Sequence, residues 1–206
     1  MMSLSLVERS PMTIAINQRL TLEEYLTDDD GSDVHYELVD GILVEMGAES
    51  PTNPQIASFL FAVFLALGVP YYRLAIGHQI AVSSVKATAR QPDLIVHSAA
   101  SEAAILADGK LLRFNLPAPV LVVEIVSHSD TDQKSRDRDY IEKRAEYAAR
   151  SIPEYWIVDP ILGLVTVCNL IDQVYQSLEF RGDDCITSLN FPGLTLTATQ
   201  LVTAGR

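Results

Sequence analysis

One carboxylate stands inside an apolar stretch where an ordinary core strand would carry none. The segment PVLVVEIVSHSD, residues 119–130, places Glu124 in a run of valine, leucine and isoleucine that predicts a buried strand. Burial of an ionised carboxylate costs on the order of several kcal/mol unless a partner compensates its charge. Alternate residues of a strand share a face, so Glu124 points the same way as Val122 and Val126. Its partner is either a structural Lys or Arg, or a divalent cation that also uses the charge for chemistry.

A second carboxylate opens another apolar strand. Asp93 begins the segment DLIVHS directly after Pro92, which favours an extended backbone immediately before it. Proline followed by aspartate is also common in ordinary turns, which is the purely structural interpretation. Two carboxylates on neighbouring apolar strands would together form a hard-oxygen site that suits Mg²⁺ or Mn²⁺.

A predicted helix supplies a cation that such a site would need. In SRDRDYIEKRAEYAARS the residues Asp139, Lys143 and Tyr147 follow one another at intervals of four, which places them on one helical face. The lysine could stabilise developing negative charge on a phosphate or orient an attacking water. The alternative is an exposed ion pair beside an aromatic residue. Glu37, in HYELVD, is either a further supporting carboxylate or the polar side of a hairpin.

Composition limits the classes of protein that fit. The chain has 206 residues, of which 48% are apolar, and its 15 basic and 27 acidic residues give a net charge of −12. This size and apolar content predict a single folded domain. The negative charge opposes non-specific adsorption to nucleic acid, but it leaves room for a locally basic cleft or a metal that bridges to phosphate. The two cysteines lack CxxC spacing, which disfavours a zinc site.

The most apolar stretch predicts a core helix. IASFLFAVFLALGV, residues 56–69, is shorter than the roughly 20 residues that span a bilayer. Asn53 and Pro54 fit a helix cap followed by proline in the first turn. Because no secretion signal is present either, we expect a cytoplasmic protein without a membrane segment.

The remaining elements predict an α/β domain, with a mixed sheet flanked by helices. Thr21 and Glu24 resemble a capping box, and Asp40-Gly41 is a strong hairpin signal. We expect residues 1–19 to be an N-terminal extension and residues 20–206 to be the domain. Between them lie predicted strands in 71–84, 93–98, 119–127 and 154–159, a connection with one helical turn in 99–118, a charged helix over 134–150 and a hairpin around 172–173.

Several stretches resemble a known family when they are taken together and in order. YELVDGILVEM, QPDLIV, PVLVVEIVS, RDYIEKRAEY, IPEYWIVDP and FPGL are similar to the Uma-type restriction endonucleases of the PD-(D/E)XK nuclease superfamily. The resemblance implies a restriction-endonuclease-like core and a Mg²⁺- or Mn²⁺-dependent endonuclease that hydrolyses phosphodiester bonds of DNA. Asp93 and Glu124 would then be the metal ligands.

The resemblance also relocates the catalytic lysine. The superfamily's lysine belongs two residues after the glutamate, where this chain has Val126. In the Uma-type pattern it stands on the following helix, which makes Lys143 the catalytic candidate. Glu37, Asp139 and Tyr147 would support the site, with Glu37 matching the family's Tyr-Glu strand.

Three functions therefore stay open. The first is an active nuclease, for which analogy with this fold suggests a homodimer. The second is a catalytically inactive nuclease-fold protein that binds nucleic acid or a protein, favoured by the charge of −12 and by Val126. The third is a structural protein in which Glu124 merely pairs with Lys143.

Overall fold

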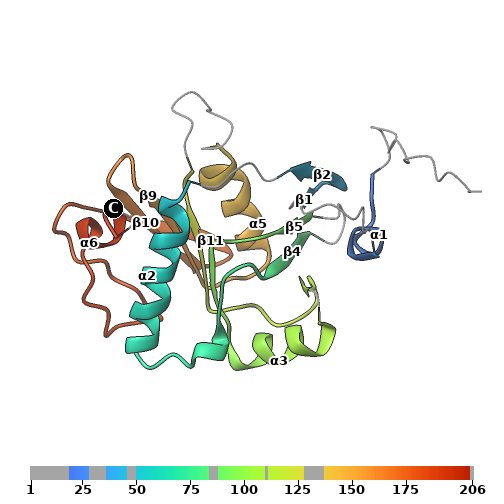
Figure 1. The fold of residues 1–206 in the computed structure, drawn as a ribbon, viewed down its shortest axis with the longest axis horizontal. Coiled ribbons are helices and arrows are strands. Elements are labelled where there is room, and N and C mark those ends of the chain that lie inside the picture. Colours follow the sequence, from blue (N-terminus) through green and yellow to red (C-terminus); the bar gives the residue numbers. More distant parts are fainter. Residues whose placement is uncertain are drawn as a thin grey trace, which may run out of the picture.

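The computed structural model describes residues 19–27, 36–45, 50–83, 88–109, 111–127 and 137–204. Within these ranges the chain forms a single α/β domain, as predicted, but its strands divide between two mixed sheets rather than one (Figure 1). Residues 1–18 of the expected N-terminal extension lie outside the described ranges.

The larger sheet has six strands in the order β11-β10-β9-β8-β6-β3. Its central pair, β8 and β9, runs parallel, whereas the other neighbours run antiparallel. All residues of β8 and β9 are buried, which confirms that the apolar run around Glu124 is covered on both faces. The strands are β3 (Leu74–Ala75), β6 (Leu94–Val96), β8 (Leu121–Ile125), β9 (Glu154–Asp159), β10 (Leu164–Ile171) and β11 (Val174–Arg181).

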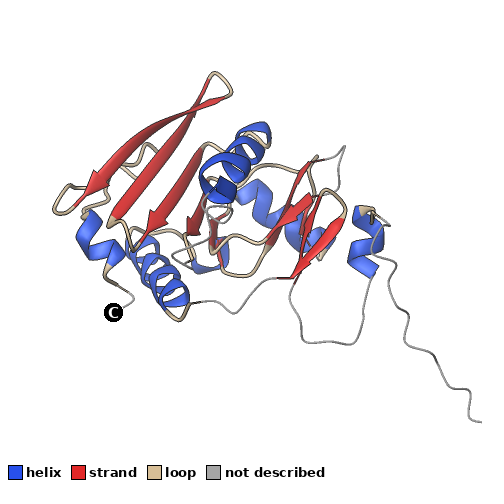
Figure 2. Cartoon of the chain, turned by 90° about the horizontal axis from the view of Figure 1, so that it is seen from above, coloured by secondary structure: helices blue, strands red, loops and turns tan. Residues whose placement is uncertain are grey.

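The smaller sheet has five strands in the order β2-β1-β5-β4-β7, and it lies beyond one end of the larger sheet (Figure 2). Its predicted hairpin forms around Asp40 and Gly41, whose φ angles of 51° and 79° suit a two-residue turn with two left-handed positions. A Cβ added to Gly41 would lie 2.9 Å from the Leu20 carbonyl oxygen, so this turn position also needs glycine for space. The strands are β1 (Tyr36–Val39), β2 (Ile42–Glu45), β4 (Gln79–Ser83), β5 (Thr88–Arg90) and β7 (Leu111–Leu112).

Helices cover both faces of the larger sheet. Helix α2 (Thr52–Ala66) and helix α6 (Ala198–Val202) share one apolar cluster with β8, β9 and β10. The opposite face packs against helix α5 (Lys143–Ala149), which continues from a π-helical turn, η2 (Arg138–Glu142). Because successive side chains of β8 alternate between these clusters, Glu124 faces α5 and not α2.

The predicted core helix is present as α2, but its start differs from the prediction. Pro51 is the residue before the helix, and Asn53 lies inside the first turn, where it is 3% exposed. Asn53 is therefore not the cap; its side-chain amide instead donates a hydrogen bond to the Ile125 carbonyl in β8. In the described part of the chain, no helix reaches the length and apolar content needed to cross a bilayer.

The other helices show where local signals succeed. Thr21 and Glu24 form the predicted capping box of helix α1 (Leu22–Thr27). The connection over 99–118 was expected to hold one helical turn, and this expectation was wrong, because helix α3 spans Ala99–Asp108. Ser98 caps the start of α3, and Gly109 ends it in the left-handed region at φ 80°. The predicted charged helix is observed over η2 and α5, and its first residues, 134–136, lie outside the described ranges.

Candidate active site

The site lies where β6 begins and the neighbouring strand β8 ends. These strands pair antiparallel, with Leu94 opposite Val123, and one further step along the register brings Asp93 opposite Glu124. Asp93 accepts a hydrogen bond through Oδ2 from the Ile125 backbone amide at 2.6 Å. The two carboxylates of the predicted metal site therefore occupy the same end of two neighbouring strands.

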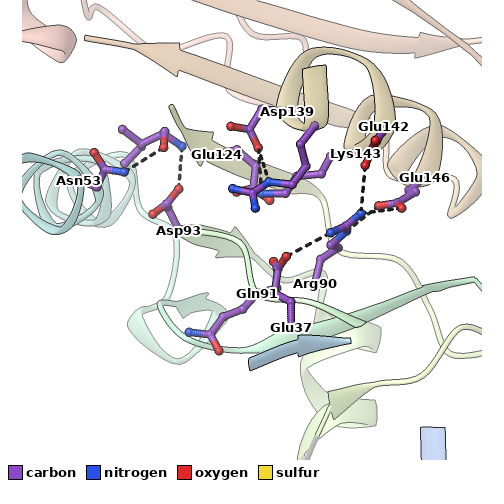
Figure 3. Close-up of polar contacts among 12 residues, drawn as sticks. Glu37, Asn53, Arg90, Gln91, Asp93, Glu124, Asp139, Glu142, Lys143 and Glu146 are labelled. Carbon is purple, nitrogen blue, oxygen red and sulfur yellow. Dashed lines mark hydrogen bonds and ion pairs between the residues drawn. The ribbon is translucent and has the colours of Figure 1, made fainter. Parts of the chain in front are cut away.

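Glu124 meets the helix that follows it in the chain. Its Oε2 lies 2.8 Å from Lys143 Nζ, and its Oε1 accepts a hydrogen bond from the Tyr147 hydroxyl at 2.6 Å. Lys143 Nζ also lies 3.0 Å from Asp139 Oδ1. These contacts confirm the predicted helical face of Asp139, Lys143 and Tyr147, which is directed at Glu124. Figure 3 shows Asp139 and Lys143 beside Glu124.

This face is buried, so the alternative interpretation, an exposed helical ion pair, is wrong. Asp139 and Lys143 are each 4% exposed, and Tyr147 is fully buried. The π-helical turn η2 lies directly before Lys143, whose backbone amide bonds to the Arg138 carbonyl five residues back. Such turns are rare, and they occur frequently at functional sites.

Burial and neighbouring charges set the protonation of the cluster. Burial, together with the negative charges of Asp139 and Glu37, raises the pKa of Glu124 to about 7, although Lys143 acts in the opposite direction. Burial alone would lower the pKa of Lys143, but Glu124 and Asp139 more than offset it and hold that pKa above its ordinary value. Lys143 is therefore an ammonium at neutral pH, whereas Glu124 can exchange its proton near neutrality.

An arginine that the sequence did not single out joins the smaller sheet to this helix. Arg90, at the end of β5, is 1% exposed and donates two hydrogen bonds of 2.8 Å to the Glu146 carboxylate in α5. Its third contact, at 3.1 Å, is with Glu37 in β1, which also accepts the Gln91 backbone amide. The sequence places Arg90 three residues before Asp93, which could have indicated that it lies near the site. No pattern in the sequence predicts which residues it contacts.

The cations around Glu37 keep it ionised. Burial raises its pKa, but Lys143, Arg90 and the Gln91 amide outweigh burial, and the pKa lies below its ordinary value. Within the described part of the chain no hydrogen bond or ion pair joins Glu37 to Glu124, so Glu37 acts on the cluster through charge and through Arg90. In Figure 3, Asn53 and Asp93 lie on one side of Glu124, and Arg90 with Glu142 and Glu146 lies on the other.

Carboxylate oxygens, which are the donors that small hard cations prefer, lie at this end of the larger sheet. Within the described ranges no group of three or more His, Cys, Asp and Glu side chains is arranged to hold a metal ion. Mg²⁺, however, is commonly bound by one or two protein carboxylates, with waters and substrate phosphate completing its shell. Asp93 and Glu124 could supply that pair, and the buried Asp139 Oδ1 has no hydrogen bond from the described residues despite its ion pair with Lys143.

The fold identifies the class of protein first. A crystal structure described as a "putative nuclease belonging to DUF820" from Anabaena variabilis superposes with a TM-score of 0.68. The similarity covers 91% of this chain and 99% of that chain at 17% sequence identity. Two mixed sheets flanked by helices are therefore a nuclease-like fold.

The family follows from the sequence match. The chain belongs to the Uma2 family, described as "Putative restriction endonuclease", whose model matches residues 22–199. This membership confirms the resemblance seen in the sequence and supports a nuclease. A search of curated proteins found no match.

Proposed function

We propose that the protein is a metal-dependent endonuclease that hydrolyses phosphodiester bonds of DNA. The observation that carries the proposal is the 2.8 Å contact between Lys143 and Glu124. The lysine expected at position 126 is replaced by valine, and Lys143 brings an ammonium group to Glu124 from a helix instead. Asp93 and Glu124 would hold Mg²⁺ or Mn²⁺, with a carboxylate pair of the kind these ions prefer.

A bound divalent ion would supply a bound water of lowered pKa and would neutralise charge on the scissile phosphate. Lys143 is protonated, so in this proposal it donates hydrogen bonds and does not act as a base. It would orient the attacking water or stabilise the negative charge that develops on the phosphate.

Three further side chains would keep the reacting groups in place. Tyr147 donates to Glu124 Oε1 and so fixes the rotation of the carboxylate. Asp139 contacts Lys143 Nζ and limits where the ammonium can lie. Glu37 adds negative charge nearby and accepts a hydrogen bond from Arg90, which also donates to Glu146 in helix α5.

The test uses three nearly isosteric changes, Asp93→Asn, Glu124→Gln and Lys143→Met. Each variant is assayed for cleavage of supercoiled plasmid and short duplex DNA in Mg²⁺ and in Mn²⁺, and Mn²⁺ binding is measured by calorimetry. We expect all three to lose cleavage and the two carboxylate variants to lose metal affinity. Glu179→Gln is the matched control, because Glu179 is exposed on β11 outside the site. Cleavage by Asp93→Asn or Glu124→Gln at the rate of the control would reject the assignment.

The alternative is an inactive protein of this fold that binds nucleic acid or a protein partner. It is favoured by the closed set of contacts at Glu124, whose two oxygens are both engaged within the protein. In that case the purified wild type shows no heat from Mn²⁺ at millimolar concentration and no cleavage. Binding of duplex DNA without cleavage would then indicate a nucleic-acid-binding protein, and a lack of DNA binding would indicate a protein-binding one.

A homodimer acting in the cytoplasm completes the proposal. It rests on analogy with nucleases that cut both strands, and on a chain with few basic residues of its own. Size-exclusion chromatography with light scattering should give twice the mass of one chain, 22.7 kDa. A mass of one chain at micromolar concentration would reject the dimer.

A further inference from the structure

Among the residues that the structure describes, Arg138 is a cation near the site without a strong partner. It is the first residue of η2, next to Asp139, and its side chain is 36% exposed. Its Nε atom is nevertheless buried and has no hydrogen-bond acceptor among the described residues. A buried, unpaired donor of a charged group is costly, so such a group is expected to have a function.

The other two cations of the site are already engaged. Lys143 lies within 3.0 Å of two carboxylates, and Arg90 lies within 3.1 Å of two. The ion pair of Arg138 with Asp139 measures 3.9 Å, which is beyond hydrogen-bond range. Asp139 is held more closely by Lys143, so it does not neutralise Arg138 well.

The charge of Arg138 acts on the same cluster. Burial raises the pKa of Glu37, but cations led by Lys143 and including Arg138 lower it below its ordinary value. At Lys143, burial and Arg138 both favour loss of the proton, although the carboxylates prevail. Arg138 is therefore near enough for its field to reach both of these residues, while part of its side chain reaches solvent.

We infer that Arg138 is a substrate-binding residue that contacts a phosphate of the DNA backbone, an inference that rests on the proposed nuclease function. A planar guanidinium binds a phosphate with two parallel hydrogen bonds. The buried Nε cannot reach a phosphate directly, so the contact would come from the part of the Arg138 side chain that is exposed. Lys143 is held between Glu124 and Asp139, within the proposed reacting centre. Arg138 is exposed enough to meet the strand as it arrives, and it offsets the repulsion between DNA and the acidic cluster.

The test separates this role from a structural one by measuring salt dependence. Arg138→Gln, Arg138→Lys and the wild type are titrated with a labelled short duplex in Ca²⁺, across a series of salt concentrations. Arg181→Gln is the control with the same change of charge, because Arg181 is exposed at the end of β11. We expect Arg138→Gln to raise the Kd for DNA about tenfold. We also expect it to lower the slope of log Kd against log salt concentration by about the amount that one phosphate contact contributes. Arg138→Lys should restore the slope but only part of the affinity, because a lysine is a point charge without the two-pronged geometry.

Cleavage in Mg²⁺ provides the second measurement. We expect Arg138→Gln to raise KM more than it lowers kcat, since the lost contact lies outside the reacting centre. If the wild type binds and cuts DNA but Arg138→Gln keeps the slope and Kd of Arg181→Gln, the inference fails and the nuclease function stands. A lower Tm with an unchanged slope would also overturn it, by assigning Arg138 a structural role. If the wild type neither binds nor cuts DNA, the proposed function fails and this inference fails with it.

Discussion

Lys143 Nζ lies between two buried carboxylate oxygens, 2.8 Å from Glu124 Oε2 and 3.0 Å from Asp139 Oδ1. One ammonium group therefore offsets the charge of two acids, and the cluster keeps an excess of negative charge. A divalent cation at Glu124 would reduce that excess, whereas removal of the lysine would increase it.

The first prediction concerns the stability of this cluster without metal. Lys143→Met leaves Glu124 and Asp139 buried without their cation, and we expect a loss of about 3–5 kcal/mol in the free energy of unfolding. Glu124→Gln combined with Lys143→Met should recover a large part of that loss, because the double variant buries one unpaired charge fewer. Urea denaturation in EDTA measures both. Equal stability of the single and double variants would contradict the coupling.

The second prediction concerns Arg90, which connects the smaller sheet to helix α5. Arg90→Lys keeps the charge but loses the paired hydrogen bonds to Glu146, and we expect about 2–3 kcal/mol of destabilisation. Because α5 carries Lys143, kcat should fall while KM for DNA changes little. Arg144→Lys is a suitable control on the same helix, since Arg144 donates its hydrogen bond to the Tyr175 carbonyl in β11, outside the site. A wild-type kcat in Arg90→Lys would show that α5 is positioned without it.

The third prediction uses a histidine pair outside the site. His97 is fully buried, with its two ring nitrogens 3.1 Å from His78 Nδ1 and from Ser101 Oγ. Burial, with help from His78 and Arg73, lowers the pKa of His97 to about 4. The unfolded chain therefore takes up a proton between about pH 6.5 and pH 4 that the folded chain refuses, and stability falls as the pH falls through this window.

The size of this effect is on the order of 3 kcal/mol, because each pKa unit corresponds to about 1.4 kcal/mol. Glu124 acts in the opposite sense, since its raised pKa of about 7 gives stability at low pH that is lost as the pH rises from about 4.5 to 7. The useful measurement is therefore the difference between His97→Asn and wild type, obtained by urea denaturation at several pH values. We expect the free energy of unfolding of the variant to rise relative to that of the wild type as the pH falls below 6.5. Parallel curves over pH 4–7 would contradict a lowered pKa at His97.

Much of the fold could be predicted because its signals are local. The Asp40-Gly41 turn, the capping box of α1 and the doubly buried β8 each depend on a few adjacent residues. Helix α3 was underestimated, because its run of alanines between polar residues carries little amphipathic pattern. The second sheet was missed because β5 and β6 are short, and nothing in the residues between them shows that the chain leaves one sheet for the other.

The candidate site could be predicted as a set of residues but not as a set of contacts. The intervals of four from Asp139 to Tyr147 defined a helical face, and the register beside β8 followed from two apolar strands. The roles of Arg90 and Asn53 depend on partners 53 or more positions away, which spacing in the sequence does not encode. Asn53 even carried a misleading signal, because an asparagine before a proline also fits a helix cap.

Val126, two residues after Glu124, is 1% exposed and packs in the same apolar cluster as Tyr147. A lysine at this position would share the strand face of Glu124, and its ammonium would either lie in this apolar cluster or meet the carboxylates that Lys143 already contacts. With its lysine on the helix instead, the chain keeps a buried hydrophobic residue directly after β8, which ends at Ile125.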